Sequence, residues 1–273
     1  MKLSITMISF GDYAGPGGMT AADFIKKCAG YGISAVDLLE YYWRDKASEV
    51  AAIPELLQDY GLALGAFCVG NNFFVNAEER PKQIDYVKEG IETAVKLGAP
   101  RLRIFGGACP LPEGMGPQDR LPVIIESIGN CIEKAAENRI TLVLENHGGT
   151  PVTSDELIAV IKAVNSSFLR INFDMGNFLS AGNENPLIAA RKLYPYVDHL
   201  HAKDLIRVGE TPPEYEACVT GEGIVPVQEC LRFFKQQGYR GYVSLEYEAQ
   251  AKQESYGGVD SSLAYLKKVL AEI

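Results

Sequence analysis

Short apolar runs alternate with amphipathic stretches along the whole chain. Eight runs are rich in branched and aromatic residues and are bounded by polar or glycine-containing segments, which is typical of buried β-strands. They cover residues 3–10, 34–39, 62–69, 101–106, 140–145, 169–174, 197–201 and 242–247. The sequence therefore predicts eight strands, each followed by a segment of another kind.

The segments between these runs have helical periodicity and helix-end signals. Thr20 is a candidate N-cap for the first helix, and Gly98 and Gly238 follow two others where glycine commonly ends a helix. The predicted helices cover residues 20–30, 48–61, 78–97, 117–138, 154–164, 184–194, 227–237 and 260–272. Strands that alternate with helices indicate an α/β protein with a parallel sheet.

Eight such units favour closure of the sheet into a (β/α)8 barrel, which typically takes about 250 residues. A doubly wound open sheet is the alternative, but the first turn reads GDYAGPGGMT and lacks the G-x-G-x-x-G spacing of that class. The 273-residue chain has no linker or break in composition. We therefore predict a single (β/α)8 barrel domain over residues 1–273.

Composition and charge narrow the class of protein further. Hydrophobic residues make up 47% of the chain and charged residues 22%, as in ordinary globular proteins. The net charge of −9 gives no overall basic footprint for nucleic acid or an anionic membrane, and no apolar run is long enough to span a bilayer. The six cysteines form no C-x-x-C pair and are interpreted as reduced thiols. We expect a cytoplasmic protein with neither nucleic-acid nor membrane partners.

The last four predicted strands end in chemically reactive residues. Their ends read ENH (145–147), DMGN (174–177), HAKD (201–204) and EYE (246–248). Catalytic side chains of such barrels lie at the C-terminal ends of the strands. Residues two apart share a face of a strand, so either member of the pairs Glu145/His147, His199/His201 and Glu246/Glu248 is a candidate for the common layer.

Convergence of Glu, Asp, His and Glu would bring three negative charges together, which a divalent cation would compensate. These donors suit Mn²⁺, Mg²⁺ or Co²⁺, with Zn²⁺ as a further candidate.

With LVLENH, INFDMGN, HLHAKD and VSLEYE on strands five to eight, the chain resembles the xylose-isomerase-like TIM-barrel superfamily. Within it, the chain looks like the sugar-phosphate isomerase/epimerase group, which includes ketose 3-epimerases, hydroxypyruvate isomerases and inosose dehydratases. The resemblance implies one divalent metal ion bound by Glu145, Asp174, His201 and Glu246. It also implies that Glu145 and Glu246 serve as acid and base, and that the protein forms a dimer or tetramer.

Other residues are candidates for substrate contact. The resemblance assigns this role to Arg207, six residues after the metal histidine, and to position 177, where this chain has Asn177 instead of the histidine of the epimerases. A second departure is Pro151, which replaces a glutamate. His147 is a further candidate, and Glu40 either bonds a sugar hydroxyl or faces solvent.

Three more features of the sequence are candidates for a structural or a binding role. Arg103 is unusual inside a strand and is expected to pair with a neighbouring carboxylate, and Lys203 and Asp204 form a structural ion pair or contact substrate. The loop GEGIVP (221–226) resembles the family's Gly-x-Gly turn and is a candidate phosphate site.

The expected reaction is proton abstraction next to a carbonyl of a small polyhydroxylated substrate, through an ene-diolate and without an organic cofactor. Return of the proton to the same carbon would epimerise the substrate, and return to the neighbouring carbon would isomerise it. A dehydratase of the inosose-dehydratase type is the alternative. An endonuclease IV-like phosphodiesterase is disfavoured by a total of three histidines and the charge of −9, and a non-catalytic sugar-binding barrel would not need four convergent ligands.

Overall fold

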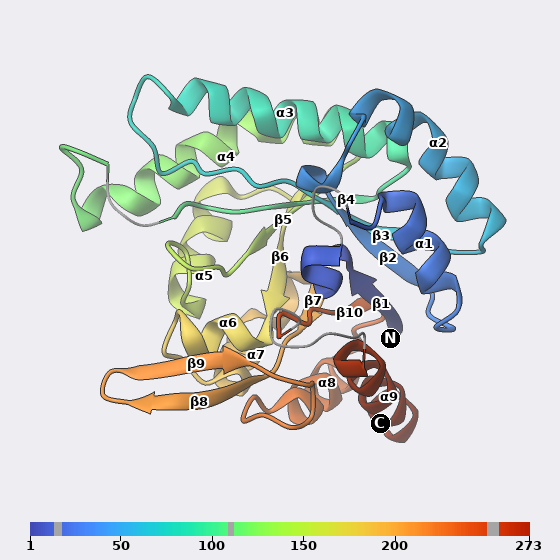
Figure 1. The fold of residues 1–273 in the computed structure, drawn as a ribbon. Coiled ribbons are helices and arrows are strands. Elements are labelled where there is room, and N and C mark those ends of the chain that lie inside the picture. The colour runs from blue at the N-terminus through green and yellow to red at the C-terminus, as the bar shows by residue number, and fades with distance from the viewer. Residues whose placement is uncertain (14–17, 109–111, 250–256) are drawn as a thin grey trace.

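The computed structural model describes residues 1–13, 18–108, 112–249 and 257–273. Eight parallel strands close into a barrel in the order β1-β10-β7-β6-β5-β4-β3-β2 (Figure 1). The barrel strands are β1 (Lys2–Thr6), β2 (Ala35–Leu39), β3 (Ala63–Cys68), β4 (Arg101–Ile104), β5 (Thr141–Glu145), β6 (Leu169–Asp174), β7 (Val197–Ala202) and β10 (Tyr242–Leu245). The predicted (β/α)8 barrel is confirmed.

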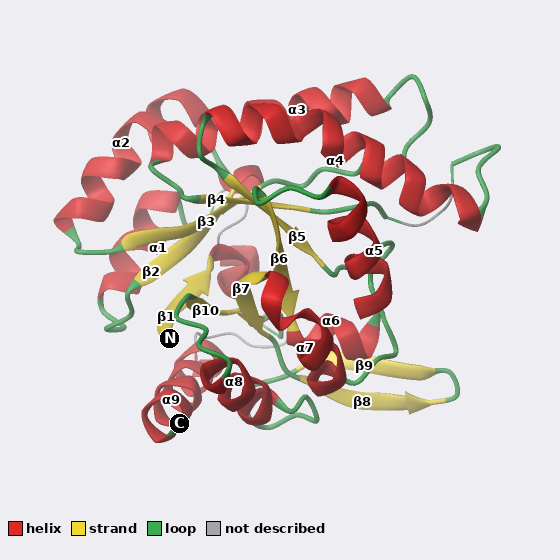
Figure 2. Cartoon of the chain, turned by 180° about the vertical axis from the view of Figure 1, so that it is seen from behind, coloured by secondary structure: helices red, strands yellow, loops and turns green. Residues whose placement is uncertain are grey.

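Helices follow the strands and cover the outside of the barrel, as the view from behind also shows (Figure 2). They are α1 (Ala21–Ala29), α2 (Lys46–Asp59), α3 (Arg80–Leu97), α4 (Arg120–Glu137), α5 (Ser154–Val164), α6 (Met175–Ser180), α7 (Pro186–Leu193), α8 (Val227–Gln236) and α9 (Gly257–Glu272). Thr20 caps α1 through a capping box with Asp23, as the sequence predicts. In the part of the chain described above, no helix combines the length and apolarity needed to cross a membrane.

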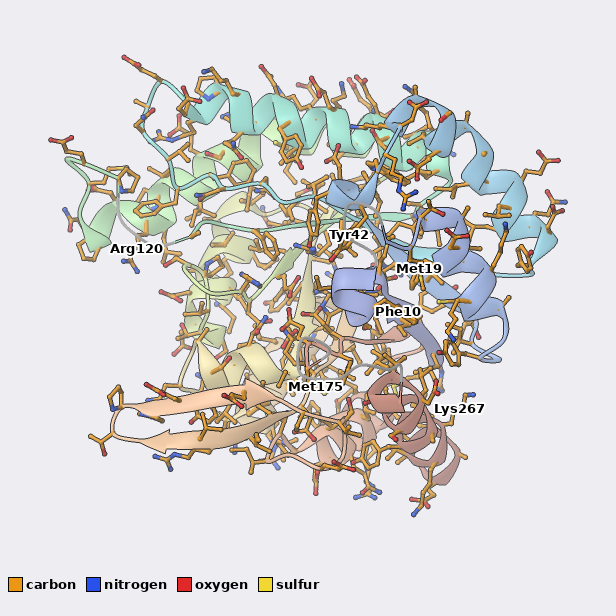
Figure 3. All side chains as sticks on the ribbon, viewed as in Figure 1. Phe10, Met19, Tyr42, Arg120, Met175 and Lys267 are labelled. Atoms are coloured by element: carbon orange, nitrogen blue, oxygen red, sulfur yellow. The ribbon has the colours of Figure 1, made fainter. Side chains whose placement is uncertain are left out.

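The first strand is shorter than predicted. It ends at Thr6, and residues Met7–Tyr13 form a 3-10 segment instead of continuing to Phe10. Phe10 packs edge-on against Phe24 of α1 in the interior (Figure 3). Ser9 donates a hydrogen bond to the carbonyl of Leu245, which ties this segment to β10. Burial of Phe10 against a helix therefore turns the chain away from the barrel wall.

An antiparallel hairpin that the sequence did not predict follows β7. It consists of β8 (Leu205–Glu210) and β9 (Pro213–Ala217) and extends away from the barrel (Figure 1). Ile206 and Val208 on β8 are exposed. The chain therefore leaves the barrel mouth immediately after β7 and returns only at the loop before α8.

Asp204 fixes the loop to which the chain returns. Its carboxylate accepts hydrogen bonds from four backbone N–H groups at 2.8–3.0 Å, those of Leu205, Gly221, Gly223 and Val225. The loop 221–226, which the sequence marked as a candidate phosphate site, thus binds a carboxylate of the same chain. Asp204 has a structural role, although its partners are N–H groups and not Lys203.

Five cysteines lie in the described part of the chain, and all of them are free thiols: Cys28, Cys68, Cys131, Cys218 and Cys230. Cys109 lies outside the described residues. The free thiols agree with the interpretation of the cysteines as reduced.

We predict that Asp204→Ala lowers the free energy of unfolding by at least about 2 kcal/mol, because several buried N–H groups lose their acceptor. Urea unfolding followed by circular dichroism measures the effect. Asp155→Ala is the control, since Asp155 is an exposed partner of Lys192 and its loss should cost less than about 1 kcal/mol. Equal losses in the two variants would contradict the assigned role of Asp204.

Candidate metal centre and adjoining cavity

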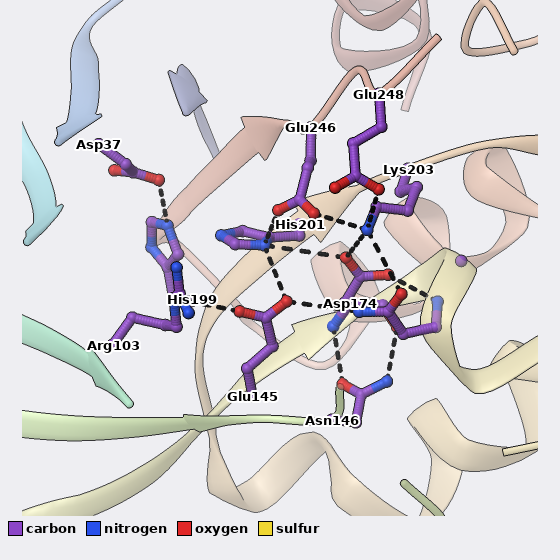
Figure 4. Close-up of polar contacts among 12 residues, drawn as sticks. Asp37, Arg103, Glu145, Asn146, Asp174, His199, His201, Lys203, Glu246 and Glu248 are labelled. Carbon is purple, nitrogen blue, oxygen red and sulfur yellow. Dashed lines mark hydrogen bonds and ion pairs between the residues drawn. The ribbon is translucent and has the colours of Figure 1, made fainter. Parts of the chain in front are cut away.

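Four ligand-type side chains meet at the C-terminal ends of neighbouring strands. Glu145 ends β5, Asp174 ends β6, His201 lies near the end of β7, and Glu246 directly follows β10. Each offers one ligand atom, and these four atoms lie within 4.8 Å of one another (Figure 4). Ligands about 2.1 Å from a common divalent ion are at most about 4.2 Å apart. The structure therefore brings together the four residues selected from the sequence, in an arrangement that one ion fits after small adjustments.

His201 lies at the centre of this cluster. Its Nδ1 is 2.5 Å from Glu246 Oε2, 3.6 Å from Glu145 Oε1 and 3.8 Å from Asp174 Oδ2. Apart from these charge contacts and the contact of Lys203 with Asp174, His201 Nδ1 and Asp174 Oδ2 are buried without a hydrogen-bond partner among the described residues. Buried polar atoms are rarely left unpaired, so these atoms fit the role of metal ligands.

Two asparagines hold the Asp174 ligand in place. The side chain of Asn146 bonds the backbone N–H and C=O of Asp174 at 2.9 Å each, and the backbone N–H of Asn177 donates to Asp174 Oδ1 at 2.7 Å. The Asn177 side chain donates to Glu145 Oε1 at 3.4 Å. Asn177 therefore contacts the ligands themselves, and it is not among the residues that line the cavity.

Lys203 is a buried cation within the cluster. Its Nζ lies 2.6 Å from Glu246 Oε1, 2.8 Å from Glu248 Oε2 and 3.5 Å from Asp174 Oδ2. Its stem passes over Gly176, where a Cβ atom would come within 2.8 Å of the lysine Cγ. The glycine at that position makes room for the lysine to reach the carboxylates.

Arg103 supplies a second buried cation from β4. Its Nε lies 3.2 Å from Glu145 Oε2, so the predicted pairing with a neighbouring carboxylate is confirmed. Its guanidinium lies 3.9 Å from the centre of the Phe105 ring, which in turn lies 4.4 Å from the ring of His147. These three side chains form one stacked wall beside Glu145.

The charges do not balance without a further cation. The centre contains four carboxylates, Glu145, Asp174, Glu246 and Glu248, and two cationic side chains, Arg103 and Lys203. With His201 neutral, as a metal ligand must be, two negative charges remain. A divalent ion would neutralise them.

The pKa values of three of the ligands show how the negative charge is compensated in the metal-free protein. Burial raises the pKa of Asp174 to about 7, although Lys203 opposes the shift. Burial would also raise the pKa of Glu246, but Lys203 and His201 hold it well below its usual range. The His201 pKa, which burial would lower, is held well above its usual range by Glu246 and Glu145. In the metal-free protein, protons bound to His201 and Asp174 therefore compensate the negative charge that a divalent ion would otherwise neutralise.

Two adjoining cavities lie next to Glu145. One of about 60 Å³ is lined by residues that include Glu145, Glu246, Glu248, Tyr41 and His147. The other, of about 210 Å³, shares Phe105, Glu145 and His147 with it and extends to Asn71, Asn72 and Thr150. His147 is exposed and lines both, as a substrate contact would. The space suits a small ligand, since pockets for drug-sized molecules measure roughly 300–1,000 Å³.

Arg207 does not lie at this site. It is exposed on β8, and its Nε donates a hydrogen bond to the carbonyl of Gly209 at 3.0 Å. The hairpin carries it away from the barrel mouth, whereas the resemblance placed it at the substrate. Glu40 is also outside the cavities, because its carboxylate pairs with Lys46 at the start of α2.

From the sequence, Lys203 had two interpretations, Glu248 was only the alternative to Glu246, and Asn146 had no role. The signal for Lys203 was its place two residues after His201, on the same face of the strand.

Comparisons with known proteins agree with this architecture. Residues 25–269 match the family model described as xylose isomerase-like TIM barrel. The uncharacterized protein YihM of Escherichia coli is 27% identical over 161 residues, which cover 59% of this chain and 47% of that protein. Inosose dehydratase 1 of Bacillus cereus is 28% identical over 127 residues, 42% of each chain. The chain therefore matches about half or less of the length of these two relatives.

Two solved structures share the fold over nearly their whole length. A D-tagatose 3-epimerase-like protein has a TM-score of 0.81 and 21% identity, with 100% of this chain and 98% of that chain covered. A xylose isomerase-like TIM barrel protein from Mycobacterium smegmatis, solved in complex with magnesium, has a TM-score of 0.77 and 21% identity, with 99% and 97% covered. At this identity the likeness shows the fold alone.

We predict that metal affinity rises with pH between about pH 5 and 8, because Asp174 and His201 must lose protons before they bind an ion. Titration of metal-stripped protein with Mn²⁺ by calorimetry, in two buffers of different ionisation enthalpy, measures both affinity and proton release. Saturation at one ion per chain with protons released is expected. A pH-independent affinity would contradict the assigned ligands.

We predict that Asp174→Asn stabilises the metal-free protein at pH 8. A buried acid whose pKa is raised to about 7 weakens the fold progressively as the pH rises from about 4 to about 7, and the amide does not ionise. The gain in melting temperature should therefore shrink towards pH 4. Mn²⁺ should raise the melting temperature of the wild type more than that of this variant, because the amide oxygen is a weaker ligand than the carboxylate. The opposite pH trend would refute the buried-acid assignment.

Proposed function

The chain belongs to the xylose isomerase-like TIM barrel family, and we propose that it is a divalent-metal-dependent isomerase or epimerase of a small polyhydroxylated ketone. The observation that carries the proposal is the pair Glu145 and Glu246, which belong to one ligand cluster and line one cavity. A bound ion would polarise the carbonyl of the substrate and stabilise negative charge that develops on its oxygen.

The two glutamates are suited to move a proton. They come from strands separated by β6 and β7, and they approach the cavity from different sides of His201. In the metal-free protein both have pKa values below their usual range, Glu246 through Lys203 and Glu145 through His201 and Arg103, against the effect of burial. A bound divalent ion would take over the role of the charged His201. Each is therefore ionised at neutral pH and able to accept a proton from a carbon next to a carbonyl.

The remaining residues that line the cavities favour a ligand rich in hydroxyl groups. The Asn72 side chain lines the larger cavity and has an NH₂ group available to donate, whereas the Asn71 amide is bonded to the backbone of Phe105. Phe105 and His147 line both cavities. Amides bond hydroxyl groups, and aromatic faces cover the apolar side of a sugar ring. These groups would orient the substrate so that its α-carbon faces one glutamate.

A dehydratase is the second candidate, and the placement of Arg207 favours it. The contacts that the resemblance gives to ketose 3-epimerases are missing from the cavity, since Arg207 lies on the hairpin and Pro151 replaces a glutamate. One relative, the Bacillus cereus protein, is an inosose dehydratase. Both reactions begin with removal of the same kind of proton, and dehydration then expels a β-hydroxyl as water.

The reaction class is tested with a panel of ketoses, ketose phosphates and inososes, incubated with Mn²⁺ in D₂O. An isomerase or epimerase is expected to return an isomer that carries deuterium on the α-carbon, and a dehydratase to release an unsaturated or keto product one water lighter. Turnover with no exchange of solvent deuterium would instead indicate hydride transfer between carbons and would contradict the two-glutamate mechanism.

We predict that Glu246→Gln lowers kcat by about 10²–10⁴-fold, because the amide keeps the size of the side chain but cannot accept the proton. Much of the Mn²⁺ affinity should survive, since an amide oxygen remains available as a ligand. Glu79→Gln is the control, because Glu79 pairs with Lys82 at the surface and its loss should leave kcat unchanged. A Glu246→Gln variant with wild-type kcat would exclude Glu246 as acid or base.

A further inference from the structure

The layer of the barrel interior directly beneath the ligand cluster is polar. Barrels of this class usually fill their interior layers with branched apolar side chains. Here the inward positions next to the ligands hold a set of fully buried polar residues: Ser4, Asp37, Asn172, His199 and Ser244. Strand register places Ser4 opposite Ser244 and Asn172 opposite His199, and a side-chain contact joins His199 to Asp37.

Asp37 and His199 form a fixed pair within this layer. His199 Nε2 lies 2.8 Å from Asp37 Oδ2, and the backbone N–H of Ala66 donates to Asp37 Oδ1 at 2.9 Å. Gly65 faces the same carboxylate, and a Cβ there would lie 2.4 Å from Asp37 Oδ1. The glycine at position 65 therefore leaves room for the Asp37 carboxylate. Figure 4 shows the Asp37–His199 pair next to His201.

Several polar atoms of this layer have no partner in the described part of the chain. They include Ser4 Oγ, Asn172 Nδ2, Asn172 Oδ1 and His199 Nδ1, and Nε2 of the ligand residue His201 directly above the layer is unpaired as well. Because both the donor and the acceptor of the Asn172 amide are unpaired, exchanging the two amide atoms cannot satisfy it. Buried atoms of this kind are nearly always bonded to protein or to ordered water. A ligand that both donates and accepts hydrogen bonds fits the set.

Water satisfies these atoms better than a second cation. Asp37, His199 and His201 have potential ligand atoms within 4.8 Å of one another, which is also the span that one water bridges with two hydrogen bonds. A second divalent ion would have to share His201 with the first. Asp37 is the one carboxylate of the layer set, and it is already bonded to His199 and Ala66.

We propose that ordered water occupies this layer and links His201 Nε2 to the Asp37–His199 pair, which makes Asp37 and His199 positioning residues for the metal ligand. The inference rests on the proposed function insofar as His201 binds the ion through Nδ1. Metal-binding histidines normally donate their other N–H to a carboxylate, a carbonyl or water. The bridge would fix both the tautomer and the ring plane of His201.

The first test is a crystal structure of the metal-free wild-type protein at a resolution that shows water. Water within about 3.2 Å of His201 Nε2 that also contacts the Asp37–His199 pair, directly or through a second water, supports the proposal. A layer without water, or one that contains a metal ion after soaking in Mn²⁺, would overturn it.

The second test compares Asp37→Asn and His199→Phe with the wild type by calorimetric titration of Mn²⁺ into metal-stripped protein. Each is expected to lower the affinity by about 10–100-fold, as the loss of a partner behind a ligand histidine does. The visible spectrum of the Co²⁺ form should also change. His199→Gln, which keeps a donor towards Asp37, should recover part of the affinity lost in His199→Phe.

Asp198→Asn is the matched control. Asp198 lies on the same strand as His199 and pairs with Arg101 outside this layer, so the change should leave affinity and spectrum within about threefold of the wild type. Melting temperatures of the metal-free variants report any loss of packing. If Asp37→Asn does not fold, the His199→Phe and His199→Gln pair still decides the question.

The outcomes separate this inference from the proposed function. A wild type that binds Mn²⁺ while Asp37→Asn and His199→Phe bind it equally well would overturn the positioning role alone. An Asp198→Asn variant that loses as much Mn²⁺ affinity as Asp37→Asn would also overturn the positioning role. A wild type that binds no divalent ion would overturn the proposed function, and the positioning role with it.

Discussion

The repulsion among three buried carboxylates is the constraint on which the rest of the site depends. Glu145, Asp174 and Glu246 converge on His201 at the barrel mouth, where solvent cannot screen their charges. Lys203 and its neighbour across the cluster, Arg103, reduce this repulsion without removing it. The remaining negative charge is what a divalent cation would neutralise. Ligand geometry, buried lysine and protonated aspartic acid are thus parts of one electrostatic balance.

Much of the fold could be predicted because it follows from simple periodicities, and alternation of strands and helices gave the barrel. The rule that barrel strands carry catalytic groups at their C-terminal ends pointed to the ends of the last four strands but left either residue of each pair open. The family resemblance then implied Glu145, Asp174, His201 and Glu246, which the structure brings together. Arg207 could not be placed, because its position depends on a hairpin whose short polar strands carry little signal.

Contacts between residues that are distant in sequence could not be predicted from local sequence patterns either. Lys203 reaches Glu248 and Glu246 only because Gly176 on another strand end leaves room for it, and the Asp37–His199 pair joins residues 162 positions apart. The loop at 221–226 has the glycines of an anion site, yet its anion is Asp204 of the same chain. Composition showed the capacity to bind an anion but not which anion fills it.

The candidate ligands and part of the cavity walls come from two different arcs of neighbouring strands. Strands β5, β6, β7 and β10 contribute the ligand set, whereas β1, β2 and β3 with their following segments contribute Thr6, Leu39, Tyr41, Asn71 and Asn72 to the cavity walls. A substitution at one of these five wall residues replaces neither a candidate ligand nor Asp37, although Asp37 itself lies on β2. Under the proposed function, point mutations of the cavity wall would therefore change substrate preference while the four candidate ligands are retained.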